Sequence, residues 1–581
     1  MCGIIGATGL DEHEIGCAID GFAYRGPDAR GAATIGNMVF GHERLSIIDL
    51  DPRSNQPLFD TSRAYSIVFN GEIYNYKEIR EELRRDYGAT FRTESDTEVL
   101  LAGYMQWGKE MLPKLRGMFA FAIHDGRTGK VFLARDHAGI KPLYYTLEGG
   151  LAFASELKGV VSIMRSRGNA VAIDRESLGL YRSFGYIPTP HTLISGVHKL
   201  TRGSWLIYDL GTKNAETGGW SPETKEVTQI SELEEAVRES IIEHTIADVP
   251  VGLFFSGGID SSIIALVLQE AGMHLETFSI SVEGREADEP YFKEIAKHLD
   301  ISAHVAQFGI KEAGDIYDHV FSKMDDPIAD SSILPTAYVS KLAREHVTVV
   351  LSGEGGDELF QGYPRQEAIA AMNGTPTVKG VLDAFTFATP SFPGKRRVLL
   401  ALAERMRDPV FFYLLTTSLA QDQLDSDSWA KAREMLASTD PLWLDRDWYL
   451  ENMLLRKSDM ATMYSSLEGR VPLLGAQVWN AAPRFVKENL SCGTKTILRD
   501  MLKKCLPARL VDRPKSGFSV STKRLFSEYE PARADLARAL AVLQKYGFPA
   551  PAHQDMIMQR YPSYAFGIVA LYRGLKNLSL V

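Results

Sequence analysis

Short apolar runs separated by glycine-rich turns dominate the chain from its start to about residue 205. Such runs predict β-strands, because turn-forming residues bound them on both sides. Apolar positions at helical spacing predict two helices, at 76–87 and 95–108. Together these patterns indicate an α+β domain with antiparallel strands. The predicted strands are IIGATG (4–9), AYSIVFNGEIYN (64–75), GMFAFAIHD (117–125), KVFLARD (130–136), KPLYYT (141–146) and LAFAS (151–155).

The pattern changes across residues 209–228, where hydrophobicity falls and Gly, Thr and Asn gather, which predicts a linker. Beyond it, an apolar run at 249–255 leads through a glycine-rich turn into a helical pattern, and further buried strands are expected within 277–282 and 348–360. Alternating strands and helices predict a parallel sheet. From about residue 365 to the end the pattern is mainly helical.

The length of 581 residues exceeds what one hydrophobic core supports. We therefore expect two domains, 2–208 and 229–581, joined by the linker at 209–228. The net charge is −10 without a basic block, which argues against nucleic acid as a partner. No apolar run approaches the ~18 residues of a membrane span. Four cysteines without a CxxC pair suit a reducing compartment, so a cytoplasmic protein is expected.

Cys2 stands directly after the initiator methionine in the run MCGIIG. Taken alone, a free cysteine is usually a small buried apolar residue. Removal of Met1, however, would leave Cys2 with a free α-amine. With a reference pKa of about 8, that amine can act as a base beside the thiol. Cys2 is therefore a candidate N-terminal nucleophile.

Nearby segments contain the groups that such a nucleophile needs. Asn70 has an amide side chain and Gly71 exposes its N–H, so both can donate to an oxyanion. Glu72 can bind an ammonium group, and Arg44 can bind a carboxylate through its planar fork. Asp96 begins a helical pattern and is either a further ligand or only a helix cap. Together these groups would hold a free amino acid by both charged ends.

These segments resemble the N-terminal-nucleophile glutamine amidotransferases, which hydrolyse glutamine to glutamate and ammonia. The motifs are MCGIIG, YRGPDARG, GHERLSIIDL, FNGEIYNY, SDTEVLL, GMFAFAIHD and RDHAGIKPLYY, in that order across residues 2–205. The resemblance implies Cys2 as nucleophile and Asn70 and Gly71 as the oxyanion hole. One departure is Tyr24, where the family usually has His. The implied glutamine-binding residues are Arg44, Leu45, Ser46, Ile47, Ile48, Asn70, Gly71, Glu72 and Asp96.

The turn SGGIDSS (256–262) follows an apolar strand and opens a helix. Its backbone N–H groups and hydroxyls would hold a pyrophosphate at the helix N-terminus. A second acidic turn, SGEGGDE (352–358), follows another apolar run. Asp260 and Asp357 would share Mg²⁺ there, since Mg²⁺ is bound by few carboxylates plus phosphate oxygens. The alternatives are a plain tight turn and carboxylates that only cap a helix.

The second half resembles the ATP-pyrophosphatase domain of asparagine synthetases, which activate a carboxylate by AMP transfer and then let ammonia displace AMP. The motifs are SGGIDSS, DDPIADSSILPTAYVSK, LSGEGGDELFQGY, LEGRVPLL, KTILRDMLKKCLP and RPKSGFSV. The resemblance implies Glu354 as an acceptor-site base or ammonia guide and Lys495 over the acyl-phosphate. Alternatively, Lys495 and Arg499 form an exposed face of one helix. The implied ATP-binding residues are Phe255, Ser256, Gly257, Gly258, Asp260, Ser261, Ser262, Ile280, Ser352 and Gly353.

Two positions depart from the asparagine synthetases. Met460 stands where the family usually has Arg, and Gly475 where an Asp usually follows the VP[FL]L motif. Relatives with this domain plan also amidate other carboxylates, so a uronic acid or a metabolite precursor is the alternative acceptor to aspartate. A non-catalytic binding protein is the third hypothesis, and the retained Cys2, Asn70 and Lys495 argue against it.

The resulting prediction is a glutamine-dependent, ATP-consuming amide ligase. We expect an N-terminal four-layer αββα Ntn-hydrolase sandwich, joined to a doubly wound parallel-sheet domain with a helical C-terminal part. Glutamine, ATP, Mg²⁺ and a carboxylate acceptor, with aspartate first, are the expected ligands. An internal tunnel is expected to carry ammonia from Cys2 to the acyl-adenylate. A homodimer is compatible with the resemblance.

Overall fold

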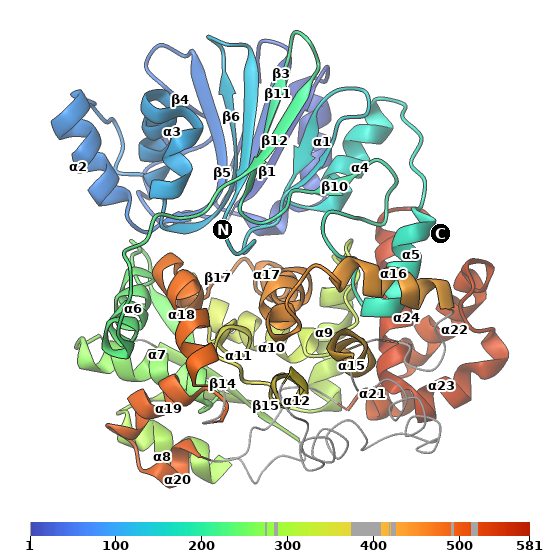
Figure 1. Ribbon diagram of the computed structural model, residues 1–581. Helices are drawn as coiled ribbons and strands as arrows, with labels where there is room; N and C mark the ends of the chain where they lie inside the picture. The colour runs from blue at the N-terminus through green and yellow to red at the C-terminus, as the bar shows by residue number, and fades with distance from the viewer. Residues whose placement is uncertain are drawn as a thin grey trace.

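The computed structural model describes residues 2–273, 276–283, 289–373, 408–417, 419, 426–489, 493–512 and 521–581. The motif RPKSGFSV, at 513–520, therefore lies outside the described residues. In the N-terminal part, two six-stranded sheets face each other (Figure 1). The first has β1 (Gly3–Thr8), β2 (Ala29–Ile35), β3 (Met38–Arg44), β8 (Tyr144–Thr146), β9 (Ala152–Ala154) and β10 (His198–Lys199). The second has β4 (Leu58–Phe59), β5 (Tyr65–Ile73), β6 (Gly117–Asp125), β7 (Lys130–Arg135), β11 (Ser204–Asp209) and β12 (Ala215–Gly219).

Alternating apolar side chains explain the layers of this domain. Phe40 of β3, Val68 of β5 and Ala120 of β6 share one buried cluster between the two sheets. Helices α1 (Glu12–Asp20) and α4 (Leu157–Ser166) cover the outer face of the first sheet. Helix α3 (Asp96–Trp107), with α2 (Tyr76–Tyr87) beside it, covers the second. The predicted αββα sandwich is confirmed. Strand β12 lies within the range expected as linker, and the domain boundaries remain a prediction.

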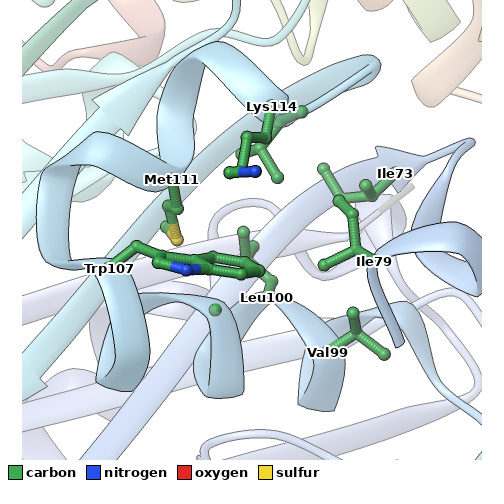
Figure 2. A pocket seen from close by; sticks show the side chains of 9 residues that line it. Ile73, Ile79, Val99, Leu100, Trp107, Met111 and Lys114 are labelled. Carbon is green, nitrogen blue, oxygen red and sulfur yellow. The ribbon is translucent and has the colours of Figure 1, made fainter. Parts of the chain in front are cut away.

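The helices α2 and α3 leave a small apolar pocket beneath them (Figure 2). Trp107, Met111 and the aliphatic residues of α3 line it, and Lys114 is the one charged residue of the lining. The Lys114 ammonium lies 3.0 Å from a Glu82 carboxylate oxygen. The pocket therefore reflects packing of the helix layer and offers few groups that would orient a polar substrate.

The C-terminal part contains a five-stranded, all-parallel sheet in the order β15-β14-β13-β16-β17. The chain runs from β13 outward to β14 and β15, and it then returns to form β16 and β17 on the other side of β13. The switch point therefore lies between β13 and β16, and ligands bind at this point in open α/β sheets. The predicted doubly wound sheet is confirmed. The strands are β13 (Val251–Phe254), β14 (Glu276–Val282), β15 (Ala303–Phe308), β16 (Val349–Leu351) and β17 (Glu468–Arg470).

Helices cover both faces of this sheet. One face shares a buried cluster with α6 (Ile230–Glu243), α7 (Ile259–Glu270), α8 (Glu289–His298), α18 (Ala476–Glu488) and α19 (Thr496–Lys503). On the other face, Phe278, Val350 and Leu467 pack against α10 (Ile333–Arg344). Helices α9 (Ile310–Phe321) and α17 (Arg456–Met463) lie beside α10, and a π-helical segment, Asp445–Leu455, runs directly into α17.

The rest of the C-terminal part is mainly helical within the described ranges, as predicted. Helices α21, α22, α23 and α24 pack together at one side, and α5 (Arg175–Phe184) packs against α16 (Figure 1). No helix of the described ranges is long and apolar enough to cross a bilayer. The remaining helices are α11 (Gly356–Leu359), α12 (Pro364–Asn373), α15 (Pro409–Thr417), α16 (Ser426–Leu436), α20 (Ala508–Val511), α21 (Thr522–Glu528), α22 (Glu530–Leu543), α23 (Gln554–Arg560) and α24 (Pro562–Asn577).

Candidate active sites

Cys2 lies just before β1, at the boundary between the two halves of the protein, and is 8% exposed (Figure 1). Its backbone nitrogen donates to the Asn70 Oδ1 at 3.1 Å, and its Sγ lies 3.8 Å from the Leu45 carbonyl oxygen. Burial raises the pKa of the Cys2 thiol. A thiol with a raised pKa needs a neighbouring base to form the reactive thiolate. When Met1 is removed, the backbone nitrogen of Cys2 becomes a free α-amine that can act as this base.

Asn70 and Gly71 lie side by side on β5, paired with Ala120 and Phe119 of β6. The Asn70 Nδ2 is buried and has no hydrogen-bond partner among the described residues. A side chain at Gly71 would collide with the Met118 carbonyl oxygen, so only glycine permits this close pairing. Asn70 therefore has an unpartnered, buried N–H donor on a side chain that contacts Cys2, as an oxyanion hole requires.

Two carboxylates lie close to this donor. The Asp96 Oδ2 accepts the Ile73 N–H at 3.0 Å, and burial raises the pKa of Asp96 to about 6. Burial and the neighbouring Asp96 raise the pKa of Glu72 well above its ordinary value. One Glu72 oxygen lies 3.3 Å from an Arg470 nitrogen, whereas Oε1 has no partner in the described part of the chain. A ligand ammonium placed between the carboxylates would lower both pKa values and relieve their repulsion.

Arg44 ends β3 and is 5% exposed. Its guanidinium donates to the carbonyl oxygens of Ile48 at 3.3 Å, Asp49 at 2.5 Å and Asp51 at 3.1 Å. These bonds hold the loop that contains the predicted ligands Leu45, Ser46, Ile47 and Ile48 against the site. The structure thus gives Arg44 a loop-forming role in addition to the predicted contact with the glutamine carboxylate, which stays a prediction.

The turn after β13 has the geometry predicted for a pyrophosphate site. Gly257 has a φ of 67°, which favours glycine, and Gly258 caps α7. The Ser261 Oγ lies 3.2 Å from both the Ser256 nitrogen and the Ser256 Oγ, so the turn is braced internally. The Ser262 Oγ is buried and has no hydrogen-bond partner within the described ranges. It is thus a donor that a phosphate oxygen at the α7 N-terminus would use.

Lys495 lies between the two acidic turns. Its ammonium is 2.5 Å from the Asp260 Oδ2 and 2.6 Å from the Asp357 Oδ1, and the residue is 5% exposed. Burial alone would lower the pKa of Lys495, but the two aspartates outweigh it and raise that pKa. The alternative of an exposed face with Arg499 is therefore wrong, because Lys495 is buried and precedes α19 as its N-cap.

Glycines keep the space around the aspartates open. A Cβ at Gly353 would lie 2.7 Å from the Asp260 Cβ, and side chains at Gly356 and Gly362 would collide with the carboxylates of Asp260 and Asp357. Two carboxylates within such a space match the ligand preference of Mg²⁺, which takes one or two carboxylates together with phosphate oxygens and water. The residues present therefore fit a magnesium pyrophosphate.

Other predicted nucleotide-site residues surround the same turn. The Ser352 nitrogen donates to the Arg470 carbonyl oxygen at 2.9 Å, and its Oγ accepts the Glu354 N–H at 3.2 Å. Phe255 is buried after β13, and Ile280 lies on β14 beside it, half-buried. Glu354 pairs with Lys457 of α17 at 3.0 Å. Lys457 was not predicted, and it gives Glu354 a fixed orientation toward the interior.

Glu358 is a further buried carboxyl that the sequence analysis did not single out. Burial and the neighbouring Asp357 raise the pKa of Glu358 to about 8, and the Tyr363 hydroxyl donates to it. Its place in the run GDELF resembled a helix cap, so no sequence signal separated it from Asp357. The structure places it beside Asp357, where a neutral carboxyl avoids a third negative charge next to Asp260 and Asp357.

Arg25 joins the two halves of the protein. It directly follows Tyr24, the residue that differs from the usual family pattern. Its Nε donates to the Cys2 carbonyl oxygen at 3.1 Å, and its guanidinium contacts Glu156 at 2.6 Å and Asp459 of α17 at 2.9 Å. All three charged side chains are at most 2% exposed. A fully buried arginine is rare, so the burial and not the sequence pattern reveals this residue.

The departures from the family pattern have packing explanations. The Tyr24 ring meets Tyr464 edge-on at 5.4 Å, and its hydroxyl accepts from Lys158 at 2.9 Å. Met460 is fully buried in the apolar cluster that includes α10. A side chain at Gly475 would collide with the Ser240 Oγ of α6. These substitutions therefore change the packing of neighbouring helices.

Two protein families match the chain. The family described as "Glutamine amidotransferase domain" matches residues 1–218, and the family described as "Asparagine synthase" matches residues 232–561. Together they define a glutamine-dependent amidotransferase joined to a carbon–nitrogen ligase. The chain belongs to the asparagine synthase family, in agreement with the motifs and with the αββα and parallel-sheet folds.

Relatives cover most of the chain. Asparagine synthetase (glutamine-hydrolyzing) 1 of Bacillus subtilis (strain 168) is 34% identical over 561 residues, which span 90% of this chain and 87% of that protein. A putative asparagine synthetase of Mycobacterium tuberculosis (strain H37Rv) is 35% identical over 581 residues, with the same coverage. Asparagine synthetase B of Escherichia coli (strain K12) is 33% identical over 58% of this chain and 59% of that protein. As a member of this family, the chain uses ATP.

Proposed function

We propose that this protein converts aspartate, ATP, glutamine and water into asparagine, AMP, pyrophosphate and glutamate. The observation that carries the proposal is the presence of two buried polar sites in one chain: the Cys2–Asn70 pair, and Lys495 between Asp260 and Asp357. Relatives named asparagine synthetase support aspartate as the acceptor. The packing explanations for Met460 and Gly475 remove the main reason to prefer another carboxylate.

Glutamine hydrolysis would begin at Cys2. The α-amine accepts the thiol proton, directly or through one water, and the thiolate attacks the glutamine amide carbon. Asn70 Nδ2 and the Gly71 N–H stabilise the oxyanion, while Glu72 and Asp96 hold the α-ammonium group. The same amine protonates the departing ammonia, and water then releases glutamate from the thioester.

Adenylation would take place at the switch point of the parallel sheet. A carboxylate oxygen of aspartate attacks the α-phosphorus of ATP, and pyrophosphate leaves toward the turn 256–262. Asp260 and Asp357 would hold Mg²⁺, which supplies charge neutralisation for the pyrophosphate when bound. Lys495, released from the aspartates, would stabilise the charge on the acyl-phosphate oxygens.

Ammonia would travel between the sites through the interior of the protein. Arg25 and Asp459 connect Cys2 to α17, and Lys457 of the same helix contacts Glu354. This chain of buried contacts follows the direction that ammonia would take. Glu354 lies at its end and can accept a proton from ammonia as nitrogen attacks the acyl carbon. AMP then leaves.

An acceptor panel tests the proposal. Purified enzyme is given glutamine and ATP with aspartate or one of several uronic acids, and pyrophosphate, AMP and amide products are measured. We expect an aspartate-saturable signal with asparagine and AMP formed in equal amounts. A signal from a sugar acid and none from aspartate would overturn the acceptor while leaving the ligase chemistry intact.

A further inference from the structure

Three side chains converge at the amino end of the parallel sheet, away from both sites described above. Glu276 opens β14, His304 is the second residue of β15, and His346 lies in the turn between α10 and β16. The His304 Nε2 is 3.1 Å from the Glu276 Oε2, and the His346 Nδ1 is 3.3 Å from the same oxygen. Two imidazole nitrogens from different segments therefore meet one carboxylate oxygen.

The spacing of these donor atoms matches a tetrahedral metal site. Zn²⁺ binds histidine nitrogen and carboxylate oxygen at about 2.0–2.2 Å, which separates neighbouring ligand atoms by roughly 3.3–3.5 Å in a tetrahedron. The observed separations of 3.1 and 3.3 Å need only a small outward shift. Two imidazoles and one carboxylate favour a transition metal over Mg²⁺ or Ca²⁺, which prefer oxygen ligands.

Aromatic packing fixes the orientation of the two imidazoles. Their ring centroids are 4.4 Å apart, and the buried Phe278 of β14 stacks on His304 with centroids 5.2 Å apart and planes 14° from parallel. The backbone N–H of His346 donates to the Ala343 carbonyl oxygen at 3.0 Å, and this bond stabilises the turn that contains His346. Groups that are already oriented lose little conformational freedom when they bind an ion.

A plain surface ion pair explains this arrangement less well. An exposed pair contributes little to stability and needs one histidine, whereas here two histidines approach one oxygen. The side chains are 34–51% exposed, so an ion and its water can reach them. We propose that Glu276, His304 and His346 bind one transition-metal ion of the zinc class, which links β14, β15 and the turn before β16.

The proposed site is separate from the nucleotide site. Glu276 pairs with Gly252, near the start of β13, whereas Ser256 follows the end of that strand. In a parallel sheet these positions lie at opposite ends of the strands, so the ion would not touch ATP. The role expected for it is therefore structural: it ties together the strands that position the pyrophosphate turn, without entering the reaction.

Metal competition tests the proposal. Full-length untagged enzyme is titrated with Zn²⁺ against a chromogenic chelator, in parallel with the variants His304→Ala, His346→Ala and Glu276→Gln. His13→Ala, an exposed histidine elsewhere, is the matched control. We expect each cluster variant to lose one equivalent of bound Zn²⁺ or to bind it at least about tenfold more weakly, whereas His13→Ala matches the wild type.

Two further measurements make the result decisive. Glutaminase activity should be normal in every variant, which shows that the fold is retained, and millimolar Mg²⁺ should leave the Zn²⁺ titration unchanged. Co²⁺ bound to the wild type should give the visible absorption of a tetrahedral nitrogen–oxygen site, and His304→Ala should lose it. Equal Zn²⁺ binding by the wild type and all three cluster variants would overturn the proposal.

Discussion

In the glutaminase site, Asn70 Nδ2 and Glu72 Oε1 have no partner among the described residues, whereas in the nucleotide site Lys495 already neutralises Asp260 and Asp357. Unsatisfied buried groups cost free energy, which a bound substrate can recover through the bonds it makes. In the nucleotide site, by contrast, a ligand has to replace the contacts between Lys495 and the two aspartates with contacts of its own. The first site is thus shaped for one small, fully enclosed substrate, and the second for a large anion that arrives with its own cation.

Loss of Cys2 is expected to have the largest effect on glutamine use. Cys2→Ala should lower glutamine-dependent synthesis by roughly 10³-fold or more, because no other group can form the thioester. Ammonia-dependent synthesis should stay near the wild-type rate, since only the ammonia source is lost. Glutamate release and asparagine formation with ammonium chloride are the two measurements. Glutaminase activity that survives the substitution would exclude Cys2 as the nucleophile.

Lys495→Ala tests the other site. It removes the cation beside Asp260 and Asp357, so we expect pyrophosphate formation to fall about 10²–10³-fold, as for the loss of one group that stabilises transition-state charge. Glutamine hydrolysis should continue. Arg499→Ala, one turn later in the chain, is the control and should retain ATP turnover. A Lys495→Ala enzyme with normal pyrophosphate release would show that this lysine only neutralises the aspartates.

Apolar patterning predicted strands β1, β5, β6, β7, β8 and β9 of the sandwich and the central strands β13, β14 and β16 of the parallel sheet. It missed the other sandwich strands, including the buried β3, and the αββα arrangement followed from the family resemblance. It missed β17, where Glu468 and Arg470 are buried charges in a three-residue strand. It also missed β15, which is largely exposed. Local pattern does not reveal that Arg470 is buried against Glu72 of the other half of the protein.

The same limit applies to the candidate sites: local motifs identify some residues, whereas others are identified only by contacts between distant segments. Motifs were enough to propose Cys2, Asn70 and Asp260, because these residues lie in turns or strands with recognisable neighbours. Arg25 and Lys457 act across segments separated by more than a hundred residues in the chain. The role of Arg25 depends on contact between the two halves of the protein, and that of Lys457 on contact between distant segments of the synthase half. Only the three-dimensional structure supplies these contacts.

Arg470 belongs to the synthase half and contacts Glu72 of the glutaminase half, so it connects the two sites. It contacts Glu72 at 3.3 Å and Glu468 at 2.6 Å, and it is fully buried. Arg470→Lys should raise the KM for glutamine about 10-fold or more, the effect of one hydrogen bond to a charged group. Ammonia-dependent synthesis should change little, and the exposed Arg484→Lys is the control. Equal loss of both activities would indicate a purely structural role.

A pH titration tests the ammonium end of the glutaminase site. Burial raises the pKa of Asp96 to about 6, so this carboxyl becomes protonated as the pH falls through that value and loses its attraction for an ammonium group. Glutamine binding to Cys2→Ala, measured by calorimetry from about pH 8 to about pH 5, should weaken below about pH 6 by up to tenfold per unit. Asp96→Asn in the same background should bind weakly at every pH. A flat profile with Asp96 intact would remove Asp96 from the ligand set.

The smallest expected effect concerns Gly475, where the family pattern has an aspartate. A side chain there would collide with the Ser240 Oγ, which donates to the Pro472 carbonyl oxygen at 2.6 Å. Gly475→Asp should therefore destabilise the fold by about 1–3 kcal/mol, the usual cost of overpacking, and lower the thermal midpoint by a few degrees. The KM for aspartate should stay unchanged, since the position packs against α6.

A double-mutant cycle separates this packing effect from a role in acceptor binding. Ser240→Ala removes the colliding oxygen, so Gly475→Asp should cost less in that background than in the wild type. The coupling is measured from thermal midpoints, alongside the KM for aspartate in all four proteins. A changed KM with additive stabilities would place position 475 at the acceptor site. Coupled stabilities with a constant KM would instead show that Ser240 occupies the space where a side chain at position 475 would begin.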